Sequence, residues 1–192
     1  MKWLVGIVAA LLIGLAVYAG SALVSTLGLI SAVRSGNTAE VMARTNLPRV
    51  RHSLVDQVVS AYLDRLGQKR PVRPFERMAI NAFGATIADD LATKLMTSEN
   101  LSVLLKSGTV RSGAENINIG TMSPLAELDA ANFFVLARRI SLVKPVEFTV
   151  RLGESQDAGS VSLHFESFTW KLSAVGLPPK VLSNIVDRLP SR

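Results

Sequence analysis

The chain has 192 residues and a formal net charge of +6, and it contains no cysteine. The absence of cysteine excludes disulfides, thiol nucleophiles, cysteine-based zinc sites and a lipid-modified cysteine as an anchor. The basic residues are spread along the chain and interleaved with acidic ones, which indicates a solvated basic surface.

The N-terminal segment lacks charged side chains from Trp3 to Val33. A helix needs roughly 20 apolar residues to cross the hydrocarbon core of a bilayer, so this segment is longer than one span. Polar residues enter after residue 20, and the large apolar residues there keep the spacing of one helix face. We therefore predict a transmembrane anchor over residues 1–24 that continues as the first helix of a single domain, residues 25–192.

A cleaved signal peptide is the alternative, because Val17-Tyr18-Ala19 suits a signal peptidase. The apolar run is nevertheless longer than the apolar region of a typical signal peptide. Lys2 and the amino terminus flank one side of the span, and Arg34 follows on the other. This distribution favours a cytoplasmic N-terminus with the domain outside the cytoplasm.

Turn and cap residues divide the next part of the chain into helices. Gly36 suits the end of the first helix, and Asn37 with Glu40 forms a box-like cap for a short helix over 38–44. A longer helix begins near Asn46 and Pro48, since proline is welcome in a first turn, and it ends at Gly67. Two further helices are predicted over 75–96, with Phe75 and Met78 on the buried face, and over 99–106.

The pattern then changes from helical to alternating. Residues 107–124 are rich in Gly, Ser and Asn, and we expect a mobile loop or a loosely attached hairpin. Apolar and polar residues alternate over 146–152, 161–165 and 168–172, which predicts three antiparallel strands of a meander. Residues 133–142 are a fourth strand or end in helix, and a final helix covers 180–189. The expected fold class is α+β, with three to four helices packed on three to four strands.

Both ends of the domain resemble a bacterial family of unknown function, the domain-of-unknown-function family 2939. Its members have a membrane segment that runs into a helix ending A-x-x-x-G-D/N, then a D/N-x-P-x-x-R-x-S-L segment, and they close with a W-K-L strand. The matching positions here are Ala32, Gly36, Asn37, Asn46, Pro48, Arg51, Ser53, Leu54, Trp170, Lys171, Leu172, Val175, Leu177 and Pro178.

This resemblance implies a membrane-anchored envelope protein of Gram-negative bacteria and implies no activity. Two positions depart from the family pattern: Asn37 stands where Asp is usual, and "ESF" at 166–168 replaces a Gly-containing turn. The order of helices and meander is also similar to cone-shaped nuclear-transport-factor-like domains, which often hold a pocket. That second likeness concerns the fold only.

Two candidate sites follow from these elements. If the sheet is cupped, Trp170, His164 and Glu166 are candidates for lining a pocket, although packing of Trp170 is the simpler interpretation. A cluster of basic residues near the helix hairpin is a candidate anionic-lipid patch. Its members are Arg49, Arg51, Lys69, Arg70, Arg73 and Arg77.

Other polar pairs are interpreted as surface groups. His52 and Asp56 lie four residues apart with no third catalytic partner, and Asp89-Asp90 has no other ligand at metal-binding spacing. No aromatic residues interleave with the basic ones for base stacking, so we expect no nucleic acid, and we expect no cofactor or metal.

The sequence thus predicts a single-pass protein of the bacterial inner membrane with a non-catalytic binding or scaffolding domain in the periplasm. Its partners would be the membrane and an envelope protein or lipid headgroups. The alternatives are a pocket-containing enzyme or small-molecule binder, a lipid-surface protein that uses the basic patch, and a cleaved, secreted form.

Overall fold

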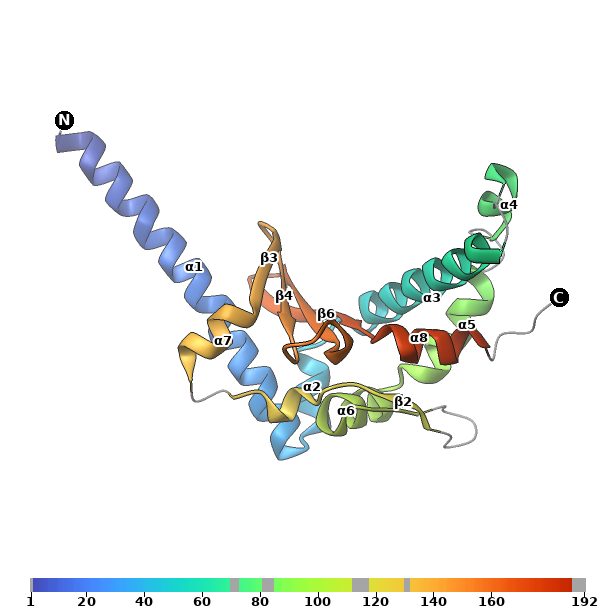
Figure 1. The fold of residues 1–192 in the computed structure, drawn as a ribbon. Coiled ribbons are helices and arrows are strands. Elements are labelled where there is room, and N and C mark those ends of the chain that lie inside the picture. Colours follow the sequence, from blue (N-terminus) through green and yellow to red (C-terminus); the bar gives the residue numbers. More distant parts are fainter. Residues whose placement is uncertain (1, 70–72, 81–84, 112–117, 130–131, 188–192) are drawn as a thin grey trace.

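The computed structural model describes residues 2–69, 73–80, 85–111, 118–129 and 132–187. In the described part of the chain, helices, a four-stranded antiparallel sheet and a two-stranded hairpin form a domain from which the first helix extends to one side (Figure 1). The fold is α+β, as predicted.

Helix α1 runs without interruption from Lys2 to Ser35. Every described side chain from Trp3 to Val17 is exposed, whereas Leu29, Ile30 and Val33 are buried in the core. The helix ends where the sequence predicts, because Gly36 adopts a φ of 69° that favours glycine. One helix therefore contributes both a free apolar rod and a core element.

The two following helices are α2, Thr38–Ala43, and α3, Leu47–Lys69. The Asn37 side chain accepts a hydrogen bond from the Glu40 amide at 3.1 Å, which confirms the predicted cap. The Glu40 carboxylate does not complete the box, since it accepts from Arg44 at 2.7 Å. Helix α3 continues two residues beyond the predicted end at Gly67, because helical glycine costs only about 1 kcal/mol.

The predicted single helix over 75–96 is replaced by α4, Pro74–Ala79, and α5, Ala85–Leu95, while residues 81–84 lie outside the described part. Of these two helices, α5 packs extensively against α3. Phe75 and Met78 on α4 are exposed, so their prediction as core residues is wrong. A correct helical spacing marks a face but does not supply a partner for it.

Helix α6, Ser98–Ser107, is followed by a hairpin of β1, Thr109–Arg111, and β2, Asn118–Thr121. Val110 and Ile119 are buried, and the Ile119 carbonyl accepts from the Asn184 side chain at 2.8 Å. The described ends of segment 107–124 therefore form a hairpin, one of the two expected alternatives, and its strands pack on the domain; residues 112–117 lie outside the described part.

The main sheet has the order β3-β4-β5-β6 and is antiparallel throughout. The ambiguous segment 133–142 contains both elements, a helix that passes directly into a strand. The elements are η2 Leu125–Glu127, α7 Phe133–Arg139, β3 Ile140–Lys144, β4 Glu147–Arg151, η3 Gln156–Ala158, β5 Ser160–Glu166, β6 Thr169–Gly176 and α8 Pro179–Asp187.

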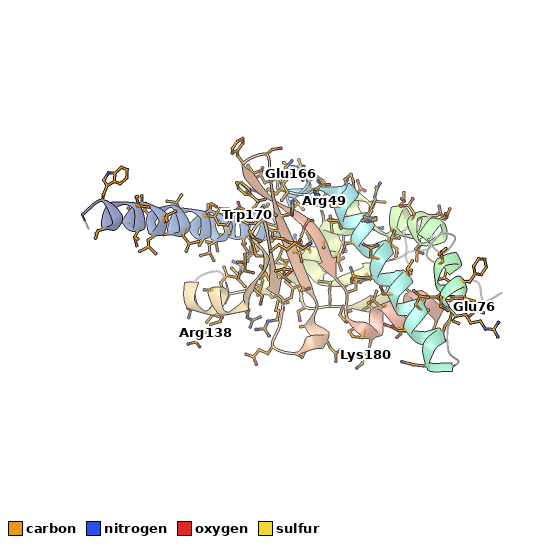
Figure 2. All side chains as sticks on the ribbon, turned by 90° about the horizontal axis from the view of Figure 1, so that it is seen from above. Arg49, Glu76, Arg138, Glu166, Trp170 and Lys180 are labelled. Atoms are coloured by element: carbon orange, nitrogen blue, oxygen red, sulfur yellow. The ribbon has the colours of Figure 1, made fainter. Side chains whose placement is uncertain are left out.

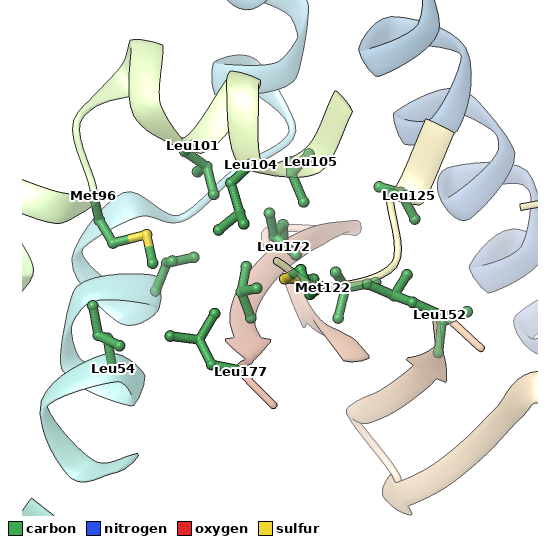
Figure 3. Packing of buried hydrophobic residues seen from close by; sticks show 14 of the residues in the cluster. Leu54, Met96, Leu101, Leu104, Leu105, Met122, Leu125, Leu152, Leu172 and Leu177 are labelled. Carbon is green, nitrogen blue, oxygen red and sulfur yellow. The ribbon is translucent and has the colours of Figure 1, made fainter. Parts of the chain in front are cut away.

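The core lies between the sheet and the helices (Figure 3). Leu101, Leu104 and Leu105 of α6 project towards Leu172 of β6, and Leu54 of α3 lies on another side of the same cluster. The free edge of β6 is covered by a parallel bridge from Thr45, next to the start of α3. Helices α1 and α3 contact β6 directly, and α6 contributes its leucines to the shared core.

Candidate membrane-facing site

An aromatic cluster joins the sheet to α1. The ring of Trp170 is buried, and its centroid lies 5.2 Å from Tyr18, 4.8 Å from Phe148 and 5.1 Å from Phe165. The Trp170 Nε1 donates a hydrogen bond to Ser21 Oγ at 3.0 Å. Trp170 is therefore a packing residue that binds the last strand to the membrane-type helix.

The tip of the β3–β4 hairpin lies beside the same part of α1. The Tyr18 hydroxyl donates a hydrogen bond to the Pro145 carbonyl. Three apolar side chains at this tip are exposed: Leu142 by 69%, Val143 by 56% and Val146 by 41%. Figure 1 shows the hairpin projecting on the side from which the free half of α1 extends.

The β5–β6 turn lies at the same end of the sheet, because alternate connections of an antiparallel meander share one end. Its two central residues, Ser167 and Phe168, have φ values of 49° and 64°. Such values are uncommon for a bulky residue. Phe168 is nevertheless 94% exposed. Glu166, which ends β5 two residues earlier, lies beside Arg49 (Figure 2). This end of the sheet thus presents apolar side chains from two hairpins.

The three residues predicted to line a pocket do not share one face of the sheet. Trp170 pairs with Phe165, so His164 points to the opposite face, because neighbouring residues on a strand alternate. Glu166 accepts a hydrogen bond from Asn46 Nδ2 at 2.8 Å and lies 3.6 Å from Arg49 Nε. Trp170 therefore does not lie beside His164 and Glu166 in a common cavity.

His164 lies between Glu147 and Lys171 on the outer face of the sheet. Its Nδ1 is buried and has no hydrogen-bond partner among the described residues. The groove that is lined by described residues of α3 and α8 lies elsewhere, and it is open and partly polar. His52 and Asp56 are a largely exposed pair at 3.7 Å along one helix.

The residues of the predicted basic patch are distributed along α3 and beyond. Arg49 and Arg51 lie in its first turns, and Lys69 is its last residue, about 30 Å further along the helix axis. Arg73 precedes α4, which contains Arg77, and Arg70 lies outside the described residues. Arg51 Nε donates to the Met96 carbonyl at 3.2 Å, so it stabilises the contact with the end of α5.

The comparison with protein families decides the assignment. The family model described as a protein of unknown function (DUF2939) matches residues 11–104. This match supports the assignment of the chain to that family. The match covers most of α1 and continues into α6, so it includes the second part of the exposed rod, from residue 11 onwards, and the helical layer.

No curated protein and no solved structure matches the chain. The main sheet lies after the segment matched by the DUF2939 model. Its resemblance to the C-terminal strand pattern of the family remains a prediction, and the family description supplies no activity.

The apolar tip of the β3–β4 hairpin is not among the sites predicted from the sequence. Its signal is the segment "SLVKPV" at 141–146, in which apolar residues occupy neighbouring positions and do not alternate cleanly. A strand with one buried face does not need such a pair. The apolar pair indicates a contact surface only when the structure shows that α1 passes beside this segment.

Proposed function

We propose that the protein is a single-pass membrane protein whose domain is held at the bilayer surface and acts as a non-catalytic binding or scaffolding module. One observation carries this proposal: α1 is a single helix whose first half is an exposed apolar rod and whose second half belongs to the core. Val5–Ser35 is long and apolar enough to cross a membrane. No flexible linker separates the anchor from the domain.

Retention of the N-terminal segment is favoured over cleavage. A peptidase that cut after Ala19 would remove Tyr18, whose ring packs on Phe165 and Trp170. It would also remove the hydrogen bond from Tyr18 to the hairpin tip at Pro145. Cleavage at this site would therefore remove packing contacts from the core of the mature domain.

The proposed location is the bacterial inner membrane, with the N-terminus in the cytoplasm and the domain in the periplasm. Lys2 precedes the span, and positive residues are retained on the cytoplasmic side. Arg34 follows the span, but it is committed to the domain, because it donates to the carbonyls of Ala126 and Leu128 at 2.7 and 2.6 Å. Arg34 is therefore weak evidence for placing this end of the span in the cytoplasm.

A binding role is supported by the open groove between α3 and α8. Polar side chains of Gln57 and Asp64 line it together with Leu182. An open surface of this kind suits a polypeptide segment, whereas small-molecule and catalytic sites usually enclose most of the ligand.

The absence of cysteine allows a direct test in cells. Two single variants that leave Lys2 in place, Trp3→Cys and Glu154→Cys, are treated with a membrane-impermeant maleimide after the outer membrane has been permeabilised. We expect labelling at 154 alone, resistance of the protein to alkaline carbonate extraction, and an intact N-terminus by mass spectrometry. Labelling at 3 would reverse the proposed orientation, and a mature chain starting near residue 20 would refute the anchor.

A further inference from the structure

We propose that the tip of the β3–β4 hairpin, residues 142–146, is a second membrane-contact element that enters the lipid headgroup region beside α1. This inference rests on the proposed function, because it requires α1 to lie in a bilayer. It goes beyond the proposed function by naming residues 142–146 as a surface of the domain that binds lipid.

The length of α1 gives the first argument. The exposed rod from Trp3 to Val17 spans about 22 Å at 1.5 Å per residue, whereas the hydrocarbon core is about 30 Å thick. Twenty residues from Trp3 reach Ala22, which is already buried in the domain. The bilayer must therefore thin by roughly 8 Å or extend to the level where α1 contacts the sheet.

The side chains where α1 contacts the sheet favour a bilayer that extends to this level over a bilayer that thins. Tyr18 lies on α1 at the level where the helix meets the sheet, and its hydroxyl contacts Pro145 at the tip of the hairpin. Leu142 pairs with the buried Phe148, so its side chain lies on the sheet face that carries the aromatic cluster. The register shifts between Leu142 and Lys144, which leaves Val143 as an extra exposed apolar residue.

The charged residues indicate a shallow depth. Lys144 lies among the apolar residues of the tip, is largely exposed and lies 3.7 Å from Glu147. A lysine there can bury its stem and extend its ammonium group to anionic headgroups. Because β3 is an edge strand with one unpaired side, the hairpin remains in the hydrated interface and stays out of the hydrocarbon centre.

Lipid is the occupant that the position favours. The tip lies beside α1, because Tyr18 contacts Pro145, and the exposed Phe168 lies at the same end of the sheet. Phe75 and Met78 are equally apolar and exposed, but α4 lies at the opposite end of the molecule from the free half of α1 (Figure 1). They provide a control for exposed hydrophobicity without proximity to the membrane.

The test uses the full chain in vesicles of phosphatidylethanolamine and phosphatidylglycerol. A single cysteine is introduced by Val143→Cys, Met78→Cys, Glu154→Cys or Leu12→Cys and labelled with an environment-sensitive dye. Lipids with a nitroxide near the headgroup or deep in the acyl chain quench the dye. We expect the label at 143 to be quenched at least threefold more strongly by the shallow nitroxide than the labels at 78 and 154.

The label at 12 separates the two proposals. If it is not quenched by the deep nitroxide, the anchor itself is wrong. If it is quenched while the label at 143 behaves like that at 154, the anchor stands and the hairpin contact is refuted. Protection of position 143 from a maleimide in cells but not in vesicles would identify a protein as the occupant and also refute lipid contact.

Discussion

Replacement of Leu29 by Ala tests whether the membrane-type helix is part of the domain core. Leu29 is 1% exposed, whereas Leu12 on the same helix is 61% exposed. Loss of a buried leucine costs about 2–5 kcal/mol of unfolding free energy, since both transfer energy and cavity formation contribute. Leu12→Ala removes the same atoms from a position without domain contacts and should change stability by no more than about 0.5 kcal/mol.

The measurement is thermal unfolding of the full chain in detergent micelles, followed by near-ultraviolet circular dichroism. For a chain of this size, 1 kcal/mol corresponds to about 2–4 °C, so Leu29→Ala should lower Tm by roughly 4–20 °C. Leu12→Ala should leave Tm nearly unchanged. Equal effects of the two substitutions would mean that the second half of α1 does not belong to the core, and both proposals would lose their basis.

Two further predictions concern backbone conformation. Gly108 has a φ of 70°, and an added Cβ would lie 1.9 Å from the Met122 carbonyl oxygen, so Gly108→Ala should destabilise by more than about 2 kcal/mol in denaturant titration. In the same assay Gly67→Ala should stabilise by about 0.5–1 kcal/mol, because this helical glycine has no close neighbour; a loss there would contradict its placement in α3. Phe168→Gly should relieve about 1 kcal/mol of turn strain and raise Tm, and an unchanged Tm would argue against the left-handed turn.

Local chemistry made much of the fold predictable. Gly36 and Asn37 specify the end of α1 and the start of α2 by backbone conformation and capping, which depend on neighbouring residues alone. The alternation in β4, β5 and β6 likewise reflects one buried face. These signals lie within a few residues, so a single sequence is sufficient to detect them.

The candidate site depends on contacts that no local pattern specifies. Trp170 was recognisable as a packing residue, but its partners Tyr18 and Ser21 lie at the other end of the chain. The exposed face of α4 shows the reverse problem, because Phe75 has helical spacing but no partner among the described elements. Periodicity identifies which face is apolar, and only tertiary structure identifies what covers it.

The contact between Ser21 and Trp170 also affects when the domain can fold during synthesis. The two residues are separated by 149 positions, so α1 cannot complete its packing until β6 has been synthesised. At 5–20 residues per second, the ribosome needs roughly 7–30 s to bridge that interval. During this time the apolar face of Leu29 and Ile30 has no strand to cover it, and we expect it to depend on chaperones or on the membrane surface. Truncation near the C-terminus should therefore yield an inserted but unfolded chain, a ready substrate for quality-control proteases.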